Sequence, residues 1–188
     1  MTKYLILVKH SLPEIQTDRP ANTWRLSAEG RSRAQRLAEQ LTGFEPEAIL
    51  SSNEPKAQET AEIVAGQLHL EMQVIPDLYE HDRSSVPYLS HESFQASIRD
   101  FFQKPDDLVF GNETADQAYS RFYKAIHSVL INHRDKTVVV MTHGTVISLF
   151  VSRLTGTSAL ELWNQLGLPS FIAMELGSST VIVRGKII

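Results

Sequence analysis

Cysteine is absent from the 188 residues, which excludes disulfide bonds, thiolate metal sites and a cysteine nucleophile. No block of lysine and arginine stands out, and the formal net charge is −4, so the charge gives no reason to expect nucleic acid or an anionic membrane as a partner. The apolar run at 4–8 is too short for a signal-peptide core or a membrane span. Together, these absences predict a cytoplasmic protein.

The composition that remains is typical of a globular protein, because 42% of the residues are hydrophobic and 21% are charged. The length predicts a single domain over residues 1–188. Short apolar runs predict strands at 4–8, 48–50, 72–75 and 137–141. Between them, helical spacing of apolar residues predicts helices at about 27–41, 54–68, 92–103, 114–129 and 144–154.

The chain ends differently, with two apolar runs at 171–176 and 180–184 that are separated by Gly177-Ser178-Ser179. This pattern predicts a hairpin. Two helix starts carry capping residues: Ser27 is expected to cap one helix, and Thr114 with Gln117 forms the pattern of a capping box. The sequence therefore predicts a three-layer α/β sandwich, with a mostly parallel central sheet, helices on both faces and an antiparallel edge.

Two of the predicted strands are followed directly by a histidine, His10 and His143. Sites in open α/β sheets lie beyond the carboxyl ends of the strands, so we expect the two imidazoles to converge. A neutral imidazole can attack phosphorus, while a second, charged imidazole and the ammonium groups of Lys9 and Lys56 can neutralise phosphoryl oxygens. Gly144 opens a helix whose free N–H groups suit a phosphate.

Cleavage of a phosphate ester of an alcohol also needs a proton for the leaving oxygen. The candidate donor is Glu80, in the loop after the third predicted strand. Spacing alone is equally consistent with a solvated loop carboxylate at this position. No cluster of side chains has the spacing of zinc ligands, so no metal site is predicted.

Six short motifs follow one another along residues 4–156: Lys9-His10-Ser11, Leu26-Ser27-Ala28-Glu29-Gly30, Ser51-Ser52 with Lys56-Ala57 and Thr60-Ala61, Leu78-Tyr79-Glu80, Gly111-Asn112-Glu113-Thr114, and Thr142-His143-Gly144. In this order they resemble the histidine phosphatase superfamily, which includes the cofactor-dependent phosphoglycerate mutases. The resemblance implies that His10 is the phosphorylated nucleophile and Glu80 the proton donor. It also implies a phosphate pocket of Lys9, Lys56 and His143, and catalysis without a metal or an organic cofactor.

The motifs depart from the family pattern at three positions, because lysines 9 and 56 replace arginines and Ser11 replaces glycine. Lysine keeps the charge but loses the planar fork that grips two phosphate oxygens. Arg83 either turns into the pocket and restores a guanidinium or is a surface loop residue. The Ser11 side chain either crowds the site or donates a hydrogen bond to the substrate.

The sequence thus predicts a phosphomonoester hydrolase that acts through a phosphohistidine on a small phosphorylated metabolite. Two alternatives stay open. A phosphomutase would need a closed pocket, for which the segment 75–137 is short, and a relative with weak or no turnover would bind a phosphorylated ligand only. We expect the loop 82–113 to cover the pocket and set specificity, and we expect a monomer or a homodimer.

Overall fold

A computed structural model describes residues 2–177 and 181–186 of the chain. Six strands form one sheet in the order β3-β2-β4-β1-β5-β6. The first four in this order are parallel to one another, while β5 and β6 run antiparallel at one edge. The strands are β1 (Tyr4–Lys9), β2 (Ala48–Ser51), β3 (Met72–Val74), β4 (Val138–Thr142), β5 (Ser170–Glu175) and β6 (Val181–Lys186).

The central strands are buried on both faces, as their uninterrupted apolar sequences predict. Along β1, Leu5 and Leu7 contribute to one hydrophobic cluster, and Ile6 and Val8 contribute to another on the opposite face. This alternation follows from the two-residue period of a strand. The sheet therefore separates two cores, each of which needs a layer of helices.

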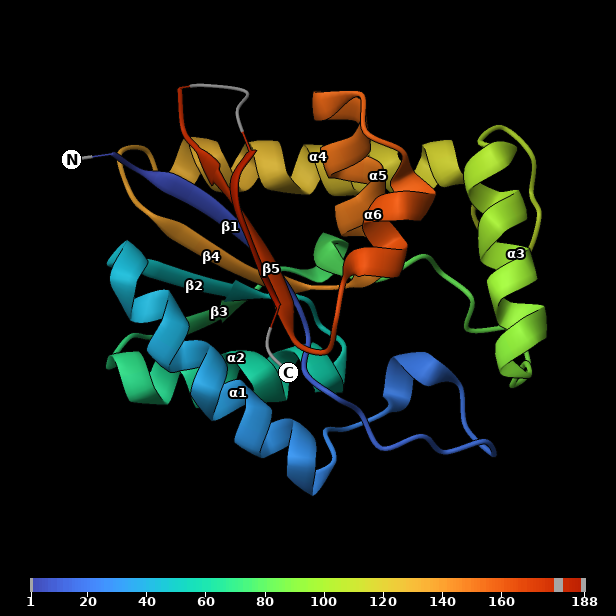
Figure 1. The fold of residues 1–188 in the computed structure, drawn as a ribbon, viewed down its shortest axis with the longest axis horizontal. Helices are drawn as coiled ribbons and strands as arrows, with labels where there is room; N and C mark the ends of the chain where they lie inside the picture. Colours follow the sequence, from blue (N-terminus) through green and yellow to red (C-terminus); the bar gives the residue numbers. More distant parts are fainter. Residues whose placement is uncertain (1, 178–180, 187–188) are drawn as a thin grey trace.

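Helices supply both layers, as Figure 1 shows. Helices α4 (Ala115–Asn132) and α5 (Gly144–Thr155) cover one face, and α1 (Ala28–Leu41) and α2 (Pro55–Leu68) cover the other. Helix α3 (His91–Gln103) lies at the end of the molecule beyond the carboxyl ends of the parallel strands and contacts α6 (Ala159–Gln165). Three short 3-10 turns are η1 (Ala21–Thr23), η2 (Thr42–Phe44) and η3 (Pro76–Leu78). The predicted α/β class and its layers are confirmed.

Both predicted helix caps are present. The hydroxyl of Ser27 accepts from the backbone N–H of Gly30 over 3.0 Å at the start of α1. At the start of α4, the side chains of Thr114 and Gln117 form the two hydrogen bonds of a capping box. These caps satisfy N–H groups that a helix leaves without internal partners.

Helix α6 is the element that the sequence analysis did not predict. It has only seven residues, which is too short to display helical spacing of apolar side chains. Its signal was the cap, because Ser158 accepts from the backbone N–H of Glu161. The predicted hairpin is confirmed by the pairing of β5 with β6, while residues 178–180 of its turn lie outside the described residues.

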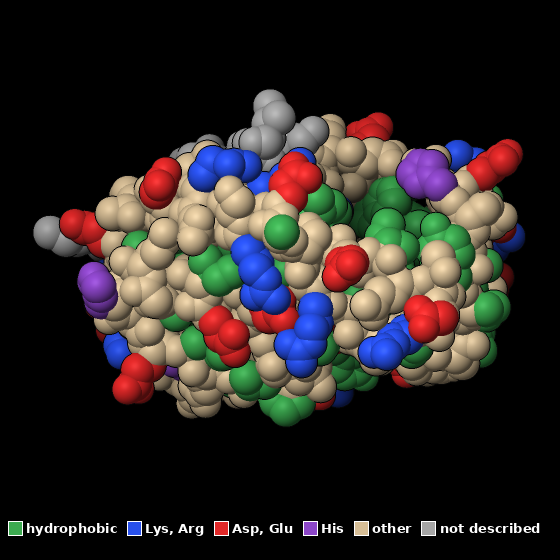
Figure 2. Space-filling view, turned by 90° about the horizontal axis from the view of Figure 1, so that it is seen from below, with side chains coloured by type: hydrophobic (Ala, Val, Ile, Leu, Met, Phe, Trp, Pro, Cys, Tyr) green, Lys and Arg blue, Asp and Glu red, His purple; other side chains and the backbone are tan. Residues whose placement is uncertain are grey.

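Acidic and basic side chains are interspersed on the face that α1 and α2 cover, which Figure 2 shows from below. Within the described part of the chain, no helix is long and apolar enough to cross a membrane.

Candidate active site

The two strand-end histidines lie side by side at the carboxyl edge of the sheet. Strands β1 and β4 are parallel neighbours, and the backbone N–H of His10 donates to the carbonyl of Thr142 over 3.0 Å. The ring centroids of His10 and His143 are consequently 5.2 Å apart, with 62° between the ring planes. The structure thus brings together the pair on which the site prediction depends.

The His10 ring is oriented by its own backbone neighbour. Its Nδ1 lies 2.7 Å from the carbonyl oxygen of Ser11, and since a carbonyl only accepts, Nδ1 carries the proton and donates it. The lone pair is then on Nε2. Burial holds the pKa of His10 well below its ordinary value, and the ammonium groups of Lys56 and Lys9 act in the same direction. His10 is therefore neutral at pH 7 and carries a nucleophilic nitrogen.

His143 is fully buried, and its Nε2 lies 2.8 Å from the hydroxyl of Ser52 and 3.5 Å from Oε1 of Glu54. Burial and the ammonium of Lys56 hold the pKa of His143 well below its ordinary value, although the carboxylate of Glu80 opposes them. The imidazole is therefore neutral, and the expectation of a charged second histidine was wrong. The reason is that desolvation of a buried ring outweighs one nearby carboxylate.

Lys9 directs its side chain across the start of α5. Its Nζ donates to the carbonyl oxygen of Leu166 over 3.0 Å and lies 5.9 Å from the ring centroid of Trp163. A Cβ on Gly144 would lie only 3.1 Å from Cε of Lys9. Gly144 therefore makes room for the lysine stem, in addition to opening the helix.

Ser11 is fully buried and joins the end of β1 to α1 and α2. Its hydroxyl donates to the carbonyl of Gly30 over 2.7 Å, and its backbone N–H donates to the hydroxyl of Thr60 over 3.0 Å. The first turn of α1 comes so near that a Cβ on Gly30 would lie 2.0 Å from the carbonyl oxygen of Leu12. This placement does not support the substrate contact that the sequence analysis expected of Ser11.

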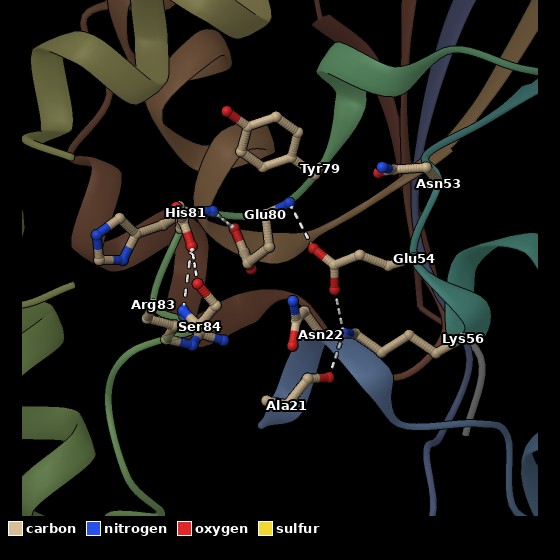
Figure 3. Close-up of a pocket in the computed structure, with 11 residues that line it drawn as sticks. Ala21, Asn22, Asn53, Glu54, Lys56, Tyr79, Glu80, His81, Arg83 and Ser84 are labelled. Carbon is tan, nitrogen blue, oxygen red and sulfur yellow. Dashed lines mark hydrogen bonds and ion pairs between the residues drawn. The ribbon is translucent and has the colours of Figure 1, made fainter. Parts of the chain in front are cut away.

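A cavity of about 160 Å³ opens beside the histidines, and Figure 3 shows its walls. Lys56, Glu80 and Arg83 line it, whereas His10 and His143 are 7% and 0% exposed and are not among its lining residues. In the part of the chain that the structure describes, no three His, Asp or Glu side chains form a group that could hold a metal ion. The lining residues are Ala21, Asn22, Asn53, Glu54, Lys56, Tyr79, Glu80, His81, Asp82, Arg83 and Ser84.

Lys56, in the first turn of α2, is buried and paired with a carboxylate of the same cavity. Its Nζ donates to the carbonyl of Ala21 over 2.7 Å and forms a close ion pair with Glu54. The other oxygen of Glu54 accepts from the backbone N–H of Glu80 over 2.9 Å. Lys56, which was expected to face the phosphate, is therefore already paired with the carboxylate of Glu54.

The buried carboxylate of Glu80 is held by two backbone donors. The N–H of His81 donates to one oxygen over 2.9 Å, and the N–H of Thr145, in the first turn of α5, donates to the other over 3.2 Å. Burial raises the pKa of Glu80, but the charge of Arg83 and the hydrogen bond from the N–H of His81 act against it, and the pKa lies below its ordinary value. Glu80 is ionised in this environment.

Arg83 lines the cavity from the loop after Glu80, as one of its two predicted placements requires. Its guanidinium carbon lies 4.8 Å from the ring centroid of Phe94 on α3. The Nη1 atom is buried, and it has no hydrogen-bond partner among the described residues. A buried donor without a partner costs about 1–3 kcal/mol.

Arg121, on α4, holds the loop around Glu80 through hydrogen bonds to its backbone carbonyls. Its Nη1 donates to the carbonyls of Asp77 and Tyr79 over 2.9 Å each, and its Nη2 donates to the carbonyl of Glu80 over 3.1 Å. The carboxylate of Glu113 pairs with Nη2 over 2.6 Å. Arg121 therefore holds three backbone carbonyls between residues 77 and 80, including that of Glu80 itself.

His81 anchors the same loop on the side of α3. Its Nε2 donates to the carbonyl of Glu113 over 3.2 Å, and its ring packs on Phe101 with the centroids 4.2 Å apart. Burial, together with the charge of Arg83, lowers the pKa of His81 below its ordinary value. A neutral, hydrogen-bonded and packed ring indicates a structural contribution for this histidine.

Residues 5–182 match the family model of the histidine phosphatase superfamily, branch 1. The chain belongs to this superfamily. Among curated relatives, a metal-independent phosphoserine phosphatase from Arabidopsis thaliana is 30% identical over 142 residues, which are 71% of this chain and 60% of that protein. The adenosylcobalamin/alpha-ribazole phosphatase of Escherichia coli is 25% identical over 144 residues, 74% of this chain and 71% of that protein. This chain therefore spans about three fifths of the length of the plant relative.

The histidine phosphatase fold is also shown by solved structures. A phosphoserine phosphatase from Entamoeba histolytica, in complex with phosphoserine, superposes with a TM-score of 0.80 at 17% identity, covering 97% of this chain and 96% of the other. At this identity the likeness shows the fold alone.

Two residues of the site escaped the sequence analysis, Glu54 and Arg121. Glu54 stands two positions before Lys56 within a recognised motif, and an acidic residue beside a predicted phosphate ligand was a signal that could have been used. Arg121 had no local signal for its part in the loop, because the carbonyls that it holds lie 41–44 positions away in the chain.

Proposed function

We propose that this protein is a phosphomonoesterase that forms a phosphohistidine on Nε2 of His10. The observation that carries the proposal is the hydrogen bond from His10 Nδ1 to the carbonyl of Ser11, beside a second buried imidazole. This hydrogen bond assigns the free lone pair to Nε2 and aims one nitrogen of a neutral ring.

In the first step, Nε2 attacks phosphorus, a P–N bond forms and the P–O bond to the alcohol breaks. The leaving oxygen takes a proton, and the alcohol departs. In the second step, water attacks the phosphohistidine and passes a proton to the Glu80 carboxylate, the P–N bond breaks, His10 is regenerated, and inorganic phosphate leaves. No electron transfer occurs, and the reaction needs no metal or organic cofactor in this proposal.

Glu80 is proposed as the proton donor of the first step. Its carboxylate is ionised beside the first turn of α5, where free N–H groups favour an anion. A phosphoryl dianion that takes the N–H of Thr145 removes one stabilising hydrogen bond from Glu80 and adds a like charge beside it. Binding of the substrate would thus supply the protonated carboxyl that the leaving group needs.

Lys56 and Arg83 are proposed to bind the phosphoryl oxygens, with His143 and the N-terminus of α5 as neutral donors. Both cations line the cavity, and Nη1 of Arg83 has no hydrogen-bond partner in the part of the chain that the structure describes. Lys9 is proposed as a more distant positive charge beside Gly144. Charge-assisted hydrogen bonds of this kind stabilise the charge that develops on the transferred group.

The test is hydrolysis of para-nitrophenyl phosphate by the wild type and by His10→Ala, each with and without EDTA. We expect activity that persists in EDTA, a trapped phosphoenzyme in the wild type, and the loss of both in His10→Ala. Activity that survives in His10→Ala would exclude His10 as the nucleophile.

A binding protein with little turnover is the second candidate, and the ion pair between Lys56 and Glu54 favours it. That pair opposes capture of a phosphoryl group by the lysine. Thermal stabilisation by phosphate without a phosphoenzyme would select this alternative. If turnover returned in Lys56→Arg, the absence of a guanidinium at this position would be what limits catalysis in the wild type.

The proposed substrate is a small phosphorylated metabolite, which accords with a cavity of about 160 Å³. The curated relatives named above are a phosphoserine phosphatase and an adenosylcobalamin/alpha-ribazole phosphatase. We propose further that the protein is one domain, acts in the cytoplasm as a monomer or a homodimer, and has no nucleic acid or membrane as a partner. The net charge of −4 supports the last point.

A further inference from the structure

Glu54 places a carboxylate among the donors that a phosphoryl group would need. It is 6% exposed and lines the cavity. One oxygen pairs with the Lys56 ammonium; the other accepts from the N–H of Glu80 over 2.9 Å and lies 3.5 Å from Nε2 of His143. Figure 3 shows the carboxylate between Lys56 and Glu80. An ammonium, a backbone N–H and an imidazole are the groups that bind phosphoryl oxygens in enzymes.

A phosphoryl group and the Glu54 carboxylate therefore compete for the same donors. Lys56 and His143 belong to the phosphate pocket of the proposed function, and both already contact Glu54. Lys56 has two partners, Glu54 and the carbonyl of Ala21. It can turn to a phosphoryl oxygen only if its ion pair with Glu54 weakens.

The charges around Glu54 oppose a second anion while Glu54 is ionised. Three carboxylates line the cavity, those of Glu54, Glu80 and Asp82, against two cations, Lys56 of α2 and Arg83. The imidazoles behind them, His10 and His143, are neutral. Lys9 and Arg121 add positive charge near the two histidines, but neither lines the cavity. A dianion therefore adds two negative charges directly beside the Glu54 carboxylate, and such a state is disfavoured unless Glu54 takes a proton in addition to the one that Glu80 takes.

We propose that Glu54 takes up one proton from solvent when a phosphoryl dianion binds. Protonation breaks the ion pair, so that Nζ of Lys56 turns to the phosphoryl oxygens. The carboxyl of Glu54 then donates a hydrogen bond to the bound group, which it would otherwise repel. Glu54 thereby makes phosphate capture depend on pH. This inference rests on the proposed function only for the place of the phosphoryl group.

The test is calorimetric titration of the full chain with inorganic phosphate, between pH 5 and pH 8, in pairs of buffers with different ionisation enthalpies. Glu54→Gln keeps the size and the hydrogen-bond acceptor for Glu80 but removes the charge. Its matched control is Glu62→Gln, the same change at an exposed position of α2. Comparison with the wild type at each pH cancels the titration of phosphate itself.

We expect Glu54→Gln to bind phosphate about tenfold more tightly than the wild type at pH 8, since one linked proton changes affinity by about tenfold per pH unit. The difference should close toward pH 5, and the variant should take up one proton fewer on binding. Glu62→Gln should match the wild type. Equal or weaker phosphate binding by Glu54→Gln at pH 8, or an unchanged proton count, would overturn the proposal.

If Glu54→Gln does not fold, Glu54→Ala replaces it, and the wild type alone can still refute the proposal. Phosphate binding by the wild type at pH 8 without proton uptake would refute the proposal, while uptake of a proton that Glu54→Ala lacks would support it. These readings need no turnover. A failure of the phosphatase assay with proton-linked phosphate binding intact would therefore count against the proposed function and not against this inference.

Discussion

The two halves of the site are built in different ways. The strand half, His10 and His143, follows the ends of the adjacent strands β1 and β4, is almost fully buried and carries no charge. The loop half consists of Glu80 and Arg83, together with Lys56 at the start of α2. These three side chains line the cavity and are the ones expected to be charged. The first half owes its geometry to backbone hydrogen bonds between strands, and the second owes it to side chains such as Arg121.

This difference matches a division of roles, in which the strand half carries the nucleophile and the loop half binds the phosphoryl group of the proposed substrate. A nucleophile must be neutral and accurately aimed, and a sheet edge provides a rigid, desolvated position for it. Phosphoryl oxygens need positive charge, which only groups with access to the cavity can keep at acceptable cost. Loss of the backbone anchor of the loop half should therefore cost more than loss of one of its charges. The strand half should show itself mainly in the pH dependence of stability.

The largest expected effect is on the anchor of the loop half. Arg121→Met leaves Glu113 and three backbone carbonyls without their shared donor, and we expect a loss of about 3 kcal/mol in the free energy of unfolding. Urea denaturation measures it, with the exposed Arg134→Met as the control. A loss no larger than that of Arg134→Met would show that the loop holds its position without Arg121.

The next effect concerns the charge that the loop half presents. In Arg83→Ala, kcat/KM for para-nitrophenyl phosphate should fall about 100-fold, as for the loss of one transition-state donor. Arg83→Lys should retain part of the activity, because it keeps the charge and loses the fork. An unchanged kcat/KM in Arg83→Ala would remove this residue from the binding site and leave Lys56 as the cavity's phosphate ligand.

The strand half should set an acid limit on stability. The pKa values of His10 and His143 are lowered by burial, so the unfolded chain binds more protons than the folded one below the ordinary histidine value. The contribution of each ring is complete above about pH 6.5 and is lost as the pH falls, by up to about 1.4 kcal/mol per pH unit. Thermal denaturation from pH 7.5 to pH 5 measures the slope, which should flatten in the double variant His10→Asn, His143→Asn. An equal slope in that variant would assign the acid sensitivity to other groups.

The smallest effect is expected at Ser11, next to the nucleophile. Ser11→Ala loses one buried hydrogen bond to Gly30, which should cost about 1 kcal/mol of stability. The aim of His10 depends on the backbone carbonyl and not on the hydroxyl, so kcat/KM should stay within about twofold. A loss above tenfold with normal stability would restore Ser11 to the substrate site.

Much of the fold was predictable because its signals are local. The apolar strands, the spacing of the helices and the caps at Ser27 and Thr114 each depend on residues within a few positions of one another. Helix α6 was missed, since seven residues do not complete a recognisable period. The convergence of the two histidines was also predictable, because parallel strands end at the same edge of a sheet.

The states of the site residues were not predictable to the same degree. The neutral ring of His143, the ion pair that occupies Lys56, the hydroxyl of Ser11 on Gly30 and the approach of Arg83 to Phe94 all depend on burial or on partners from other elements. A motif states which residue types are present, but the protonation of a side chain depends on what surrounds it in space.

By itself, the sequence determined the layered fold, the family and the two strand ends that carry the imidazoles, because these follow from chain periodicity and from short motifs in order. Only the tertiary structure decided that a carboxylate of the cavity pairs with its lysine, and that one nitrogen of its arginine is buried without a partner among the described residues. The physical reason is that charge, desolvation and hydrogen bonding act through space, between residues whose separation along the chain leaves no local pattern.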